Sequence, residues 1–273
     1  MAVFTCSLFS KMLVKDIRVT VTLPLPDYFD AVMPGGRKIP ERGKKYPVLW
    51  LLHGFASDDS SWLRGSGIER YAQARRLAVV MPDCGNSFYR NIGELPRCFD
   101  FLTEELPQLL QFTFSLSARR EDNFIAGMSM GGYGAFKAAF TRPDLYAAAA
   151  SLSGGLEPVT GKNHDETPER MANPLTIPWR MRVFGENYAE FEPAREDLRQ
   201  LVCAMSVPGR TLPDLYMCCG RQDPFHGDNL HFRDFLVQKG LSVTFEDGPG
   251  FHNFDFWDPF IRRVVNWLPI RSR

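Results

Sequence analysis

Neither sign of charge is in excess in this chain. Lysine and arginine total 32 residues and aspartate and glutamate total 32, so the formal net charge is zero. Proteins that hold nucleic acid or anionic membranes need a basic surface, and this composition offers no electrostatic footprint of that kind. The balance argues against nucleic acid and favours a small-molecule partner.

Long apolar runs are missing as well. No run approaches the roughly 18 residues that a membrane-spanning helix needs. Residues 1–13 are apolar, but they lack a basic leader and a clear cleavage site, and they merge into a strand-like alternation. We therefore expect them to belong to the mature protein and not to a signal peptide.

The cysteines lack the spacing of a disulfide framework, and no histidines cluster with them as in a zinc site. They are Cys6, Cys84, Cys98, Cys203, Cys218 and Cys219. We expect reduced thiols in the core of a cytoplasmic protein, and no bound metal.

Strand-like and helix-like segments alternate along most of the 273 residues. Apolar or alternating runs predict strands at residues 17–25, 48–52, 78–81, 124–126, 147–152, 215–219 and 242–246. Helical patterns separate them at residues 68–76, 98–112, 134–140, 197–205, 229–239 and 259–267. The length allows one large domain or two small ones. The repeated order predicts a single α/β domain over residues 1–273, with a mostly parallel, doubly wound sheet and helices on both faces.

One irregular segment, residues 154–193, interrupts this alternation. It is rich in proline, glycine, asparagine and acidic residues, and it carries the aromatic residues Trp179, Phe184, Tyr188 and Phe191. A long insertion between two strands is commonly a lid or binding loop, so we predict a small cap here. The alternative is a solvated excursion whose aromatic residues pack against the sheet edge.

Residues 127–131, Gly-Met-Ser-Met-Gly, fit the pattern G-x-S-x-G. An apolar run precedes them and a small-residue helical pattern follows, which is the strand–turn–helix setting of a nucleophilic serine. Such a serine needs a strained backbone that lifts its hydroxyl into a cleft. The flanking glycines remove the Cβ atoms that would collide with the neighbouring strand and helix. Ser129 is therefore the predicted nucleophile.

A serine hydroxyl is a weak nucleophile until a histidine takes its proton and a carboxylate orients that histidine. In doubly wound hydrolases the chain order is serine, acid, histidine, each after a strand. Of the later histidines, His164 lies in the insertion and His231 in a predicted helix, while His226 follows the candidate acid too closely. His252 lies in a glycine-rich loop after a strand, so we predict that it is the base, with His226 as the alternative.

Asp223 is the predicted acid, because it follows an apolar strand and a glycine turn. The alternative for such a residue is an ordinary turn or helix-capping aspartate. Three further aspartates lie near His252 in sequence, but close neighbours point less easily at the far ring nitrogen. These are Asp247, Asp255 and Asp258.

Attack on an ester creates an oxyanion, which needs N–H donors that are already in place. We predict that Met130, directly after the nucleophile, supplies one donor and that Phe55, in the loop after residues 48–52, supplies the other. Gly54 allows close approach, and His53 is interpreted as a structural histidine that braces this loop. The candidate substrate contacts are Gly54, Trp62, Tyr89 and Phe225.

With these residues in place, the chain resembles the "Putative esterase" family of α/β-hydrolases, which includes tributyrin esterases, acetyl-xylan and feruloyl esterases, and S-formylglutathione hydrolase. The resemblance covers nearly the whole chain, and its most specific pieces are residues 51–54, 127–135, 219–223, 248–252 and 256–258. It implies an α/β-hydrolase fold, a triad of Ser129, Asp223 and His252, and an oxyanion hole formed by Phe55 and Met130.

The expected function is that of a serine carboxylesterase that hydrolyses short-chain acyl esters through an acyl-enzyme, without a metal or organic cofactor. Hydrolysis of S-formylglutathione is the nearest alternative, with Arg180, Arg182 and Arg221 as candidate cations for its carboxylates. Sugar-ester hydrolysis is another alternative, and acyl transfer would use the same residues. A non-catalytic binding module of the same fold is less favoured, because all three triad positions are filled. The sequence leaves open whether identical subunits associate.

Overall fold

The computed structural model describes residues 1–36, 38, 43–156, 183, 192–205 and 211–271. Among these residues, eight strands form one sheet in the order β1-β2-β4-β3-β5-β6-β7-β8. β2 pairs antiparallel with β1 and with β4, and the remaining pairs are parallel, as the sequence predicts. The strands are β1 (Ala2–Ser10), β2 (Lys15–Leu23), β3 (Val48–Leu52), β4 (Ala78–Pro82), β5 (Asn123–Met128), β6 (Ala148–Leu152), β7 (Asp214–Gly220) and β8 (Val243–Gly248).

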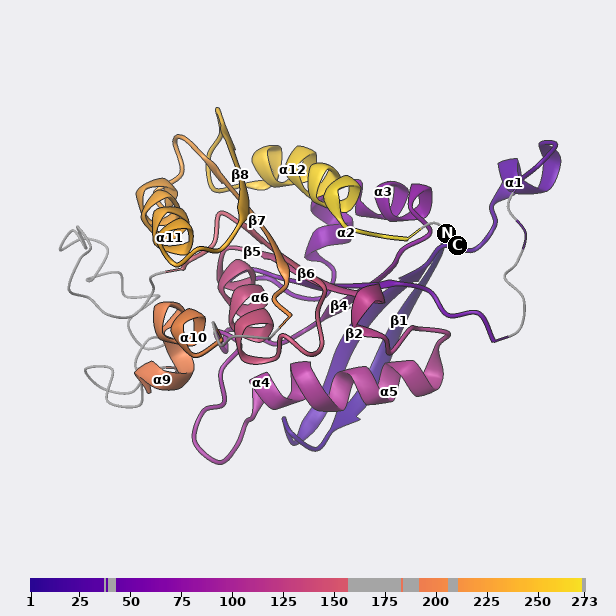
Figure 1. The fold of residues 1–273 in the computed structure, drawn as a ribbon. Helices are drawn as coiled ribbons and strands as arrows, with labels where there is room; N and C mark the ends of the chain where they lie inside the picture. The colour runs from indigo at the N-terminus through magenta and orange to yellow at the C-terminus, as the bar shows by residue number, and fades with distance from the viewer. Residues whose placement is uncertain (37, 39–42, 157–182, 184–191, 206–210, 272–273) are drawn as a thin grey trace.

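Helices cover both faces of this sheet (Figure 1). One face carries α2 (Ser61–Gly65), α3 (Ile68–Ala74) and α12 (Phe254–Trp267). The other face carries α4 (Cys98–Asp100), which continues through a π-helical turn (Phe101–Glu105) into α5 (Leu106–Thr113), and also α6 (Met130–Thr141), α10 (Leu198–Met205) and α11 (His226–Gln238).

The central strands divide their side chains between two hydrophobic cores. Along β3, Val48, Trp50 and Leu52 belong to the core that includes α6, while Leu49 and Leu51 belong to the core that includes α12. Successive side chains of a strand point to opposite faces, so a strand covered on both faces needs apolar residues at every position. This is why the central strands appear in the sequence as continuous apolar runs.

The structure adds a strand that the sequence pattern does not predict. β1 forms a hairpin with β2 at the edge of the sheet, and its Val3, Phe4 and Phe9 side chains are largely exposed. Because β1 exposes apolar residues on both of its faces, it lacks the clean alternation by which a half-buried strand is recognised. The short helices α1 (Tyr28–Val32), α2 and α9 (Pro193–Glu196) are too short for a helical period to be recognised.

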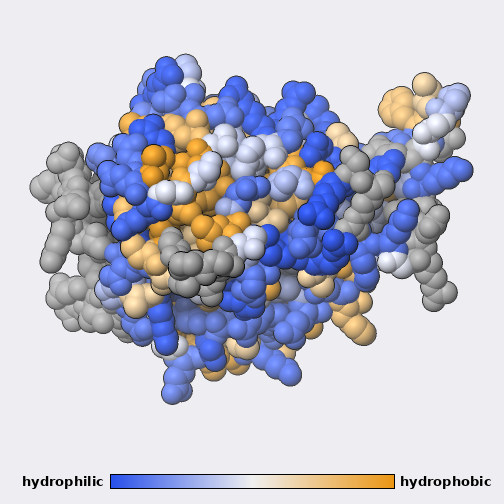
Figure 2. Space-filling view, in the orientation of Figure 1, coloured by the Kyte–Doolittle hydropathy of each residue, from blue (hydrophilic) through white to orange (hydrophobic). Residues whose placement is uncertain are grey.

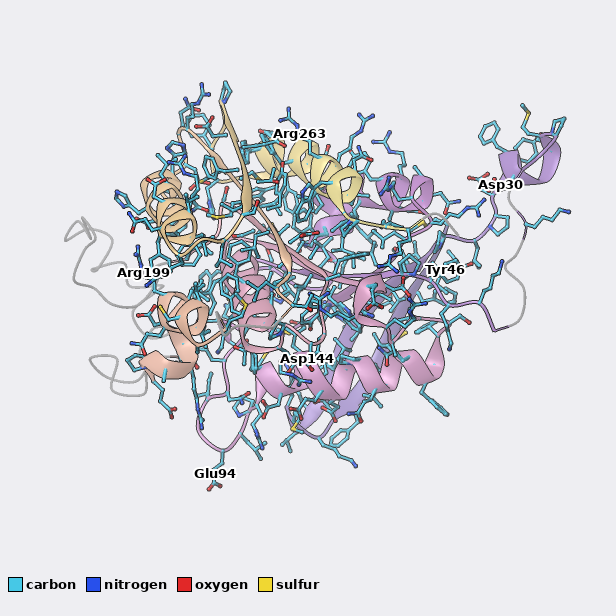
Figure 3. The ribbon with its side chains drawn as sticks, viewed as in Figure 1. Asp30, Tyr46, Glu94, Asp144, Arg199 and Arg263 are labelled. Carbon is cyan, nitrogen blue, oxygen red and sulfur yellow. The ribbon has the colours of Figure 1, made fainter. Side chains whose placement is uncertain are left out.

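Helix α1 extends away from the layered body of the protein (Figure 1). Its start is a capping box, in which Asp30 N–H donates to Asp27 and Asp27 N–H donates to Asp30. Asp30 is labelled at this projection in Figure 3. The surface here includes hydrophobic side chains, as Figure 2 shows, and the exposed residues are Tyr28, Phe29, Val32 and Met33.

Most of the predicted cap, residues 157–182 and 184–191, lies outside the described residues, and so do His164 and the four aromatic residues of the insertion. After the insertion the chain continues through α9 and α10. The guanidinium carbon of Arg199 on α10, labelled in Figure 3, lies 4.7 Å from the ring centroid of Phe235 on α11, so this side chain bridges the two helices.

Candidate active site

A sharp turn joins β5 to α6, and Ser129 lies at its apex. Ser129 has a φ of 55° and a ψ of −119°, a conformation that residues with a side chain rarely adopt. A Cβ atom on Gly127 would lie 2.3 Å from the Gly131 carbonyl oxygen, and one on Gly131 would lie 2.5 Å from the Leu52 carbonyl oxygen. Both positions therefore require glycine, and the G-x-S-x-G spacing follows from the packing of this turn.

The backbone of Ser129 is held on both sides. Its N–H donates to the Leu152 carbonyl at 2.9 Å, and its own carbonyl accepts from Gly132 N–H at 3.0 Å and Gly155 N–H at 3.1 Å. Although Ser129 is the N-cap residue of α6, its hydroxyl makes no capping hydrogen bond. Ser129 is partly exposed between two buried methionines, so the turn presents its hydroxyl at the surface of the site.

The predicted acid and base meet at the same edge of the sheet. β5, β7 and β8 are parallel, so the loops that follow them share one edge. His252, after β8, lies with Nδ1 2.8 Å from Asp223 Oδ2, after β7. Since the carboxylate only accepts, Nδ1–H is the donor and Nε2 is left for proton exchange. The Asp223 side chain is fully buried, while that of His252 is one quarter exposed.

Aromatic side chains hold the His252 ring in place. The ring meets Phe225 edge-on at a centroid distance of 5.1 Å and Trp257 at 4.9 Å. Phe225 N–H also donates to Asp223 Oδ1 at 2.8 Å. Phe225, predicted as a substrate contact, thus supports both the acid and the base. Its contact with substrate stays a prediction.

The pKa of Asp223 results from opposing influences. Burial alone would raise this pKa, but the hydrogen bond from His252, the charge of His252 when protonated, and the Phe225 N–H together lower it below its usual value. The carboxylate therefore stays ionised and accepts a hydrogen bond from Nδ1–H, which fixes the orientation of the imidazole.

The alternative candidates for the base and the acid, His226 and Asp247, have other side-chain partners. His226, the first residue of α11, has Nε2 3.3 Å from Asp247 Oδ2, and Arg221 pairs with the same carboxylate at 2.8 Å. Asp247 is therefore engaged away from His252. His231 lies on α11, in the helix that the sequence predicts, and it is exposed.

The loop that precedes Phe55 and the helix that begins at Met130 meet at the Ser129 turn. A Cβ atom on Gly54 would lie 3.4 Å from Ser129 Cβ and 3.5 Å from the Met128 carbonyl oxygen, so the loop after β3 lies against the nucleophile turn. Phe55 follows Gly54 in this loop. Met130 is the first residue of α6, where the N–H groups have no partner within the helix.

His53 braces this loop from inside the protein. Cys84 N–H donates to its Nε2 at 3.1 Å, so Nε2 carries no proton and Nδ1–H donates to the Gly54 carbonyl at 2.7 Å. His53 is buried, and burial lowers the pKa of its imidazole. A neutral structural histidine fits this place.

Trp62 and Tyr89 do not lie on an accessible surface. Trp62 is 1% exposed, its Nε1–H donates to the Leu52 carbonyl at 2.9 Å, and its ring packs on Phe254. Tyr89 is 0% exposed, and its hydroxyl donates to the His53 carbonyl at 2.8 Å. Both are core residues, which leaves no side-chain surface for the predicted contact with substrate. Their aromatic character suggested a substrate contact, but their burial depends on tertiary packing.

Among the described residues, no group of three or more histidine, cysteine, aspartate or glutamate side chains is arranged to hold a metal ion. Across the same residues, no helix is long and apolar enough to cross a membrane.

Known proteins match this chain over almost its full length. The family model described as "Putative esterase" matches residues 10–243. An acetyl esterase from Caldicellulosiruptor saccharolyticus is 29% identical over 276 residues, which cover 98% of each chain. The substrate-bound structure of FphF, a fluorophosphonate-binding serine hydrolase of Staphylococcus aureus, is 31% identical, with a TM-score of 0.82 and 99% of each chain covered. The S-formylglutathione hydrolase FrmB from the same organism is also 31% identical, with a TM-score of 0.79 and 98% of each chain covered.

Proposed function

We propose that this chain, which belongs to the "Putative esterase" family and is a serine carboxylesterase of the α/β-hydrolase fold, hydrolyses short-chain acyl esters with Ser129 as nucleophile, His252 as base and Asp223 as orienting acid. The observation that carries the proposal is the 2.8 Å hydrogen bond between Asp223 and His252, at the sheet edge where the strained Ser129 turn also lies. A buried carboxylate, a partly exposed imidazole and a serine without a capping bond match the needs of acyl transfer.

In the proposed first step, Ser129 Oγ attacks the carbonyl carbon of the ester and the carbonyl electron pair moves to oxygen. His252 Nε2 takes the hydroxyl proton, while Asp223 stabilises the imidazolium through Nδ1–H. The N–H groups of Phe55 and Met130 hold the oxyanion. When the carbonyl re-forms, the alcohol leaves with the proton from His252, and water repeats the sequence to release the acid.

Short apolar esters are the substrate class that the surroundings of the site support best. Phe251, which precedes the proposed base in the sequence, is 63% exposed, and its apolar side chain supports an apolar substrate. The acetyl esterase among the relatives also supports a small acyl group. These esters are the proposed small-molecule partners. The buried thiols Cys84, Cys98, Cys218 and Cys219 support the proposed cytoplasmic location, where thiols stay reduced.

S-formylglutathione is the second candidate substrate, favoured by the similarity to FrmB. Its glutathione carboxylates call for free cations near the site. Arg221 is committed to Asp247 at 2.8 Å, and Arg180 and Arg182 lie outside the described residues. Of these three predicted cations, Arg221 is the one that the structure describes, and its pairing with Asp247 gives no support to the glutathione thioester. Parallel measurement of kcat/KM on phenyl acetate, S-formylglutathione and acetylated xylan separates these candidates, and higher kcat/KM on either of the latter would overturn the substrate assignment.

The decisive test of the mechanism is Ser129→Ala. We expect kcat for p-nitrophenyl acetate to fall by about five orders of magnitude, because the triad acts as a unit. A fluorophosphonate probe should label the wild-type protein at Ser129, and the variant should not react. Near-wild-type turnover by the variant would refute the nucleophile, and an unlabelled wild-type protein would favour a non-catalytic binding module.

A further inference from the structure

The loop that carries Phe55 is held at two successive carbonyl groups by side chains. His53 Nδ1–H donates to the Gly54 carbonyl at 2.7 Å, and Tyr89 OH donates to the His53 carbonyl at 2.8 Å. The Gly54 carbonyl and the Phe55 N–H belong to one planar trans peptide, so fixing the carbonyl fixes the direction of the N–H. Gly54 has no side chain to restrict its backbone, and such a loop needs outside support to keep one geometry.

Tyr89 reaches this carbonyl from an unusual backbone conformation. Its φ is 50° and that of Phe88 is 53°, values that bulky residues seldom adopt. Ser87 Oγ accepts from Tyr89 N–H at 3.1 Å, and Lys137 Nζ donates to the Tyr89 carbonyl at 3.3 Å. Strained residues of this kind persist only where the surroundings hold them firmly.

The Tyr89 ring also lies directly on the helix that starts at the nucleophile. A Cβ atom on Gly134 of α6 would lie 2.4 Å from Tyr89 Cδ2, so glycine at this position makes room for the ring. Tyr89 therefore touches both structures that supply the proposed oxyanion donors: α6, which begins at Met130, and the loop of Phe55.

A buried set of charges keeps the Tyr89 turn against α6. Lys137 Nζ lies 2.6 Å from Glu196 Oε2, and Arg90 Nε lies 3.3 Å from Glu196 Oε1. Tyr133 OH donates to the same glutamate at 3.0 Å. Arg90 directly follows Tyr89, and Lys137 and Tyr133 belong to α6, so Glu196 of α9 ties the turn and the helix together. The buried Lys137–Glu196 pair is also hydrogen-bonded, and such a pair favours one arrangement of the turn and the helix over others.

We propose that Tyr89 is a positioning residue of the oxyanion hole: its hydroxyl fixes the peptide between His53 and Gly54, and together with the His53 imidazole, which fixes the next peptide, it keeps the Phe55 N–H aimed at the developing oxyanion. The proposal rests on the proposed function, since it assigns Tyr89 a role in the same acyl transfer. Tyr89 does not touch the substrate and acts only through the loop. Its effect should therefore appear in the tetrahedral state, where the oxygen carries charge, and not in the binding of the neutral ester.

Tyr89→Phe tests this directly, because it removes one oxygen atom and leaves the ring on Gly134. We expect kcat to fall about 10-fold with KM changed less than about 2-fold, the loss of one hydrogen bond that matters in the transition state. A trifluoromethyl ketone, which bonds to Ser129 Oγ as its carbonyl becomes an oxyanion and His252 takes the proton, should bind about 10-fold more weakly. Turnover is divided by the concentration of active sites, measured as the amount of fluorophosphonate that the protein takes up at completion. Unfolded protein is therefore not counted.

Tyr146→Phe is the matched control. Tyr146 is also fully buried, and its hydroxyl has no hydrogen-bond partner among the described residues, so kcat and inhibitor affinity should stay at the wild-type values. The positioning role is refuted if Tyr89→Phe leaves kcat and inhibitor affinity unchanged. It is also refuted if Tyr89→Phe and Tyr146→Phe lower these two quantities by the same factor. Failure of the proposed function would be seen separately, as a wild-type protein that the probe does not label at Ser129.

Discussion

At the scale of single residues, the nucleophile turn depends on glycines that differ in how much space surrounds them. At Gly127 a Cβ atom would lie 2.3 Å from a backbone oxygen, which cannot move aside without breaking the turn, whereas at Gly54 the nearest atom would be 3.4 Å away. We expect Gly127→Ala to lower the free energy of unfolding by about 2–3 kcal/mol through overpacking. Gly54→Ala should leave it within about 0.5 kcal/mol of wild type.

Urea denaturation followed by circular dichroism measures both variants. The pair is matched in chemistry, since each adds one methyl group to a glycine beside Ser129. Equal stabilities of the two variants would contradict the packing argument. Because Gly54 lies in the proposed oxyanion loop, activity is not the readout here.

His53 makes a separate prediction about pH. Burial lowers the pKa of its imidazole in the folded protein below the ordinary value of 6.5. A group with a lowered folded pKa contributes stability above its unfolded pKa, and this contribution is lost as the pH falls through the folded pKa. His53→Asn removes the titrating group, so the advantage of the wild type in Tm should be largest above pH 6.5 and should shrink as the pH falls toward 5.

The measurement is the difference in Tm between wild type and His53→Asn over pH 5–8. Taking the difference cancels the titration of the other histidines, which both proteins share. A difference that stays constant with pH would mean that His53 titrates alike in the folded and unfolded chains, against the neutral bracing role.

The acid and the base of the candidate site could be predicted from the sequence, because chain order and the ends of the strands determine where they lie. Asp223 and His252 each follow a strand of a parallel sheet, and parallel strands bring their carboxyl ends to one edge. The role of an aromatic residue in a loop does not follow in this way. Trp62 and Tyr89 lie in segments after strands that lead to the site, but their contacts with Leu52 and His53 are tertiary hydrogen bonds without a local sequence pattern.

At the scale of elements, the strands that are covered on both faces are the ones that the sequence predicts best. β3 has the same bounds in the prediction and in the structure, residues 48–52, because the strand is one unbroken apolar run that begins after Pro47 and ends before His53. β2 is displaced, from the predicted 17–25 to Lys15–Leu23, because its first residues pair with β1 at an exposed edge where hydrophobicity does not mark the end.

Helix α12 follows the His252 loop and packs against α2 and α3, which lie far from it in the sequence. Asp258 of α12 accepts from Gly67 N–H at 2.6 Å and from Tyr71 OH at 3.0 Å, at the start of α3. Gly65 lies against the Phe254 ring, so α2 also packs here. This pairing docks α12 directly after the His252 loop. Asp258, although near His252 in sequence, therefore has its carboxylate engaged by Gly67 and Tyr71.

At the scale of the whole molecule, the free cysteines are distributed through both cores and so report on the integrity of the fold. Cys203 on α10 is exposed, and Cys6 on β1 is partly buried, with its thiol pKa raised by burial. The four remaining thiols are buried, on both faces of the sheet: Cys84, Cys98, Cys218 and Cys219. Because the thiolate is the reactive form, a buried or high-pKa thiol reacts slowly with a disulfide reagent.

We therefore expect the native protein to show one rapid reaction with Ellman's reagent, at Cys203, and a slower one at Cys6. The other four thiols should react only after denaturation, which brings the total to the six cysteines of the sequence. Cys203→Ser is the control, and it should remove the rapid phase alone. Fewer than six thiols in denaturant without reductant would show a disulfide and contradict the reduced state. Rapid reaction of a buried thiol in the native protein would show instead that one core opens without global unfolding.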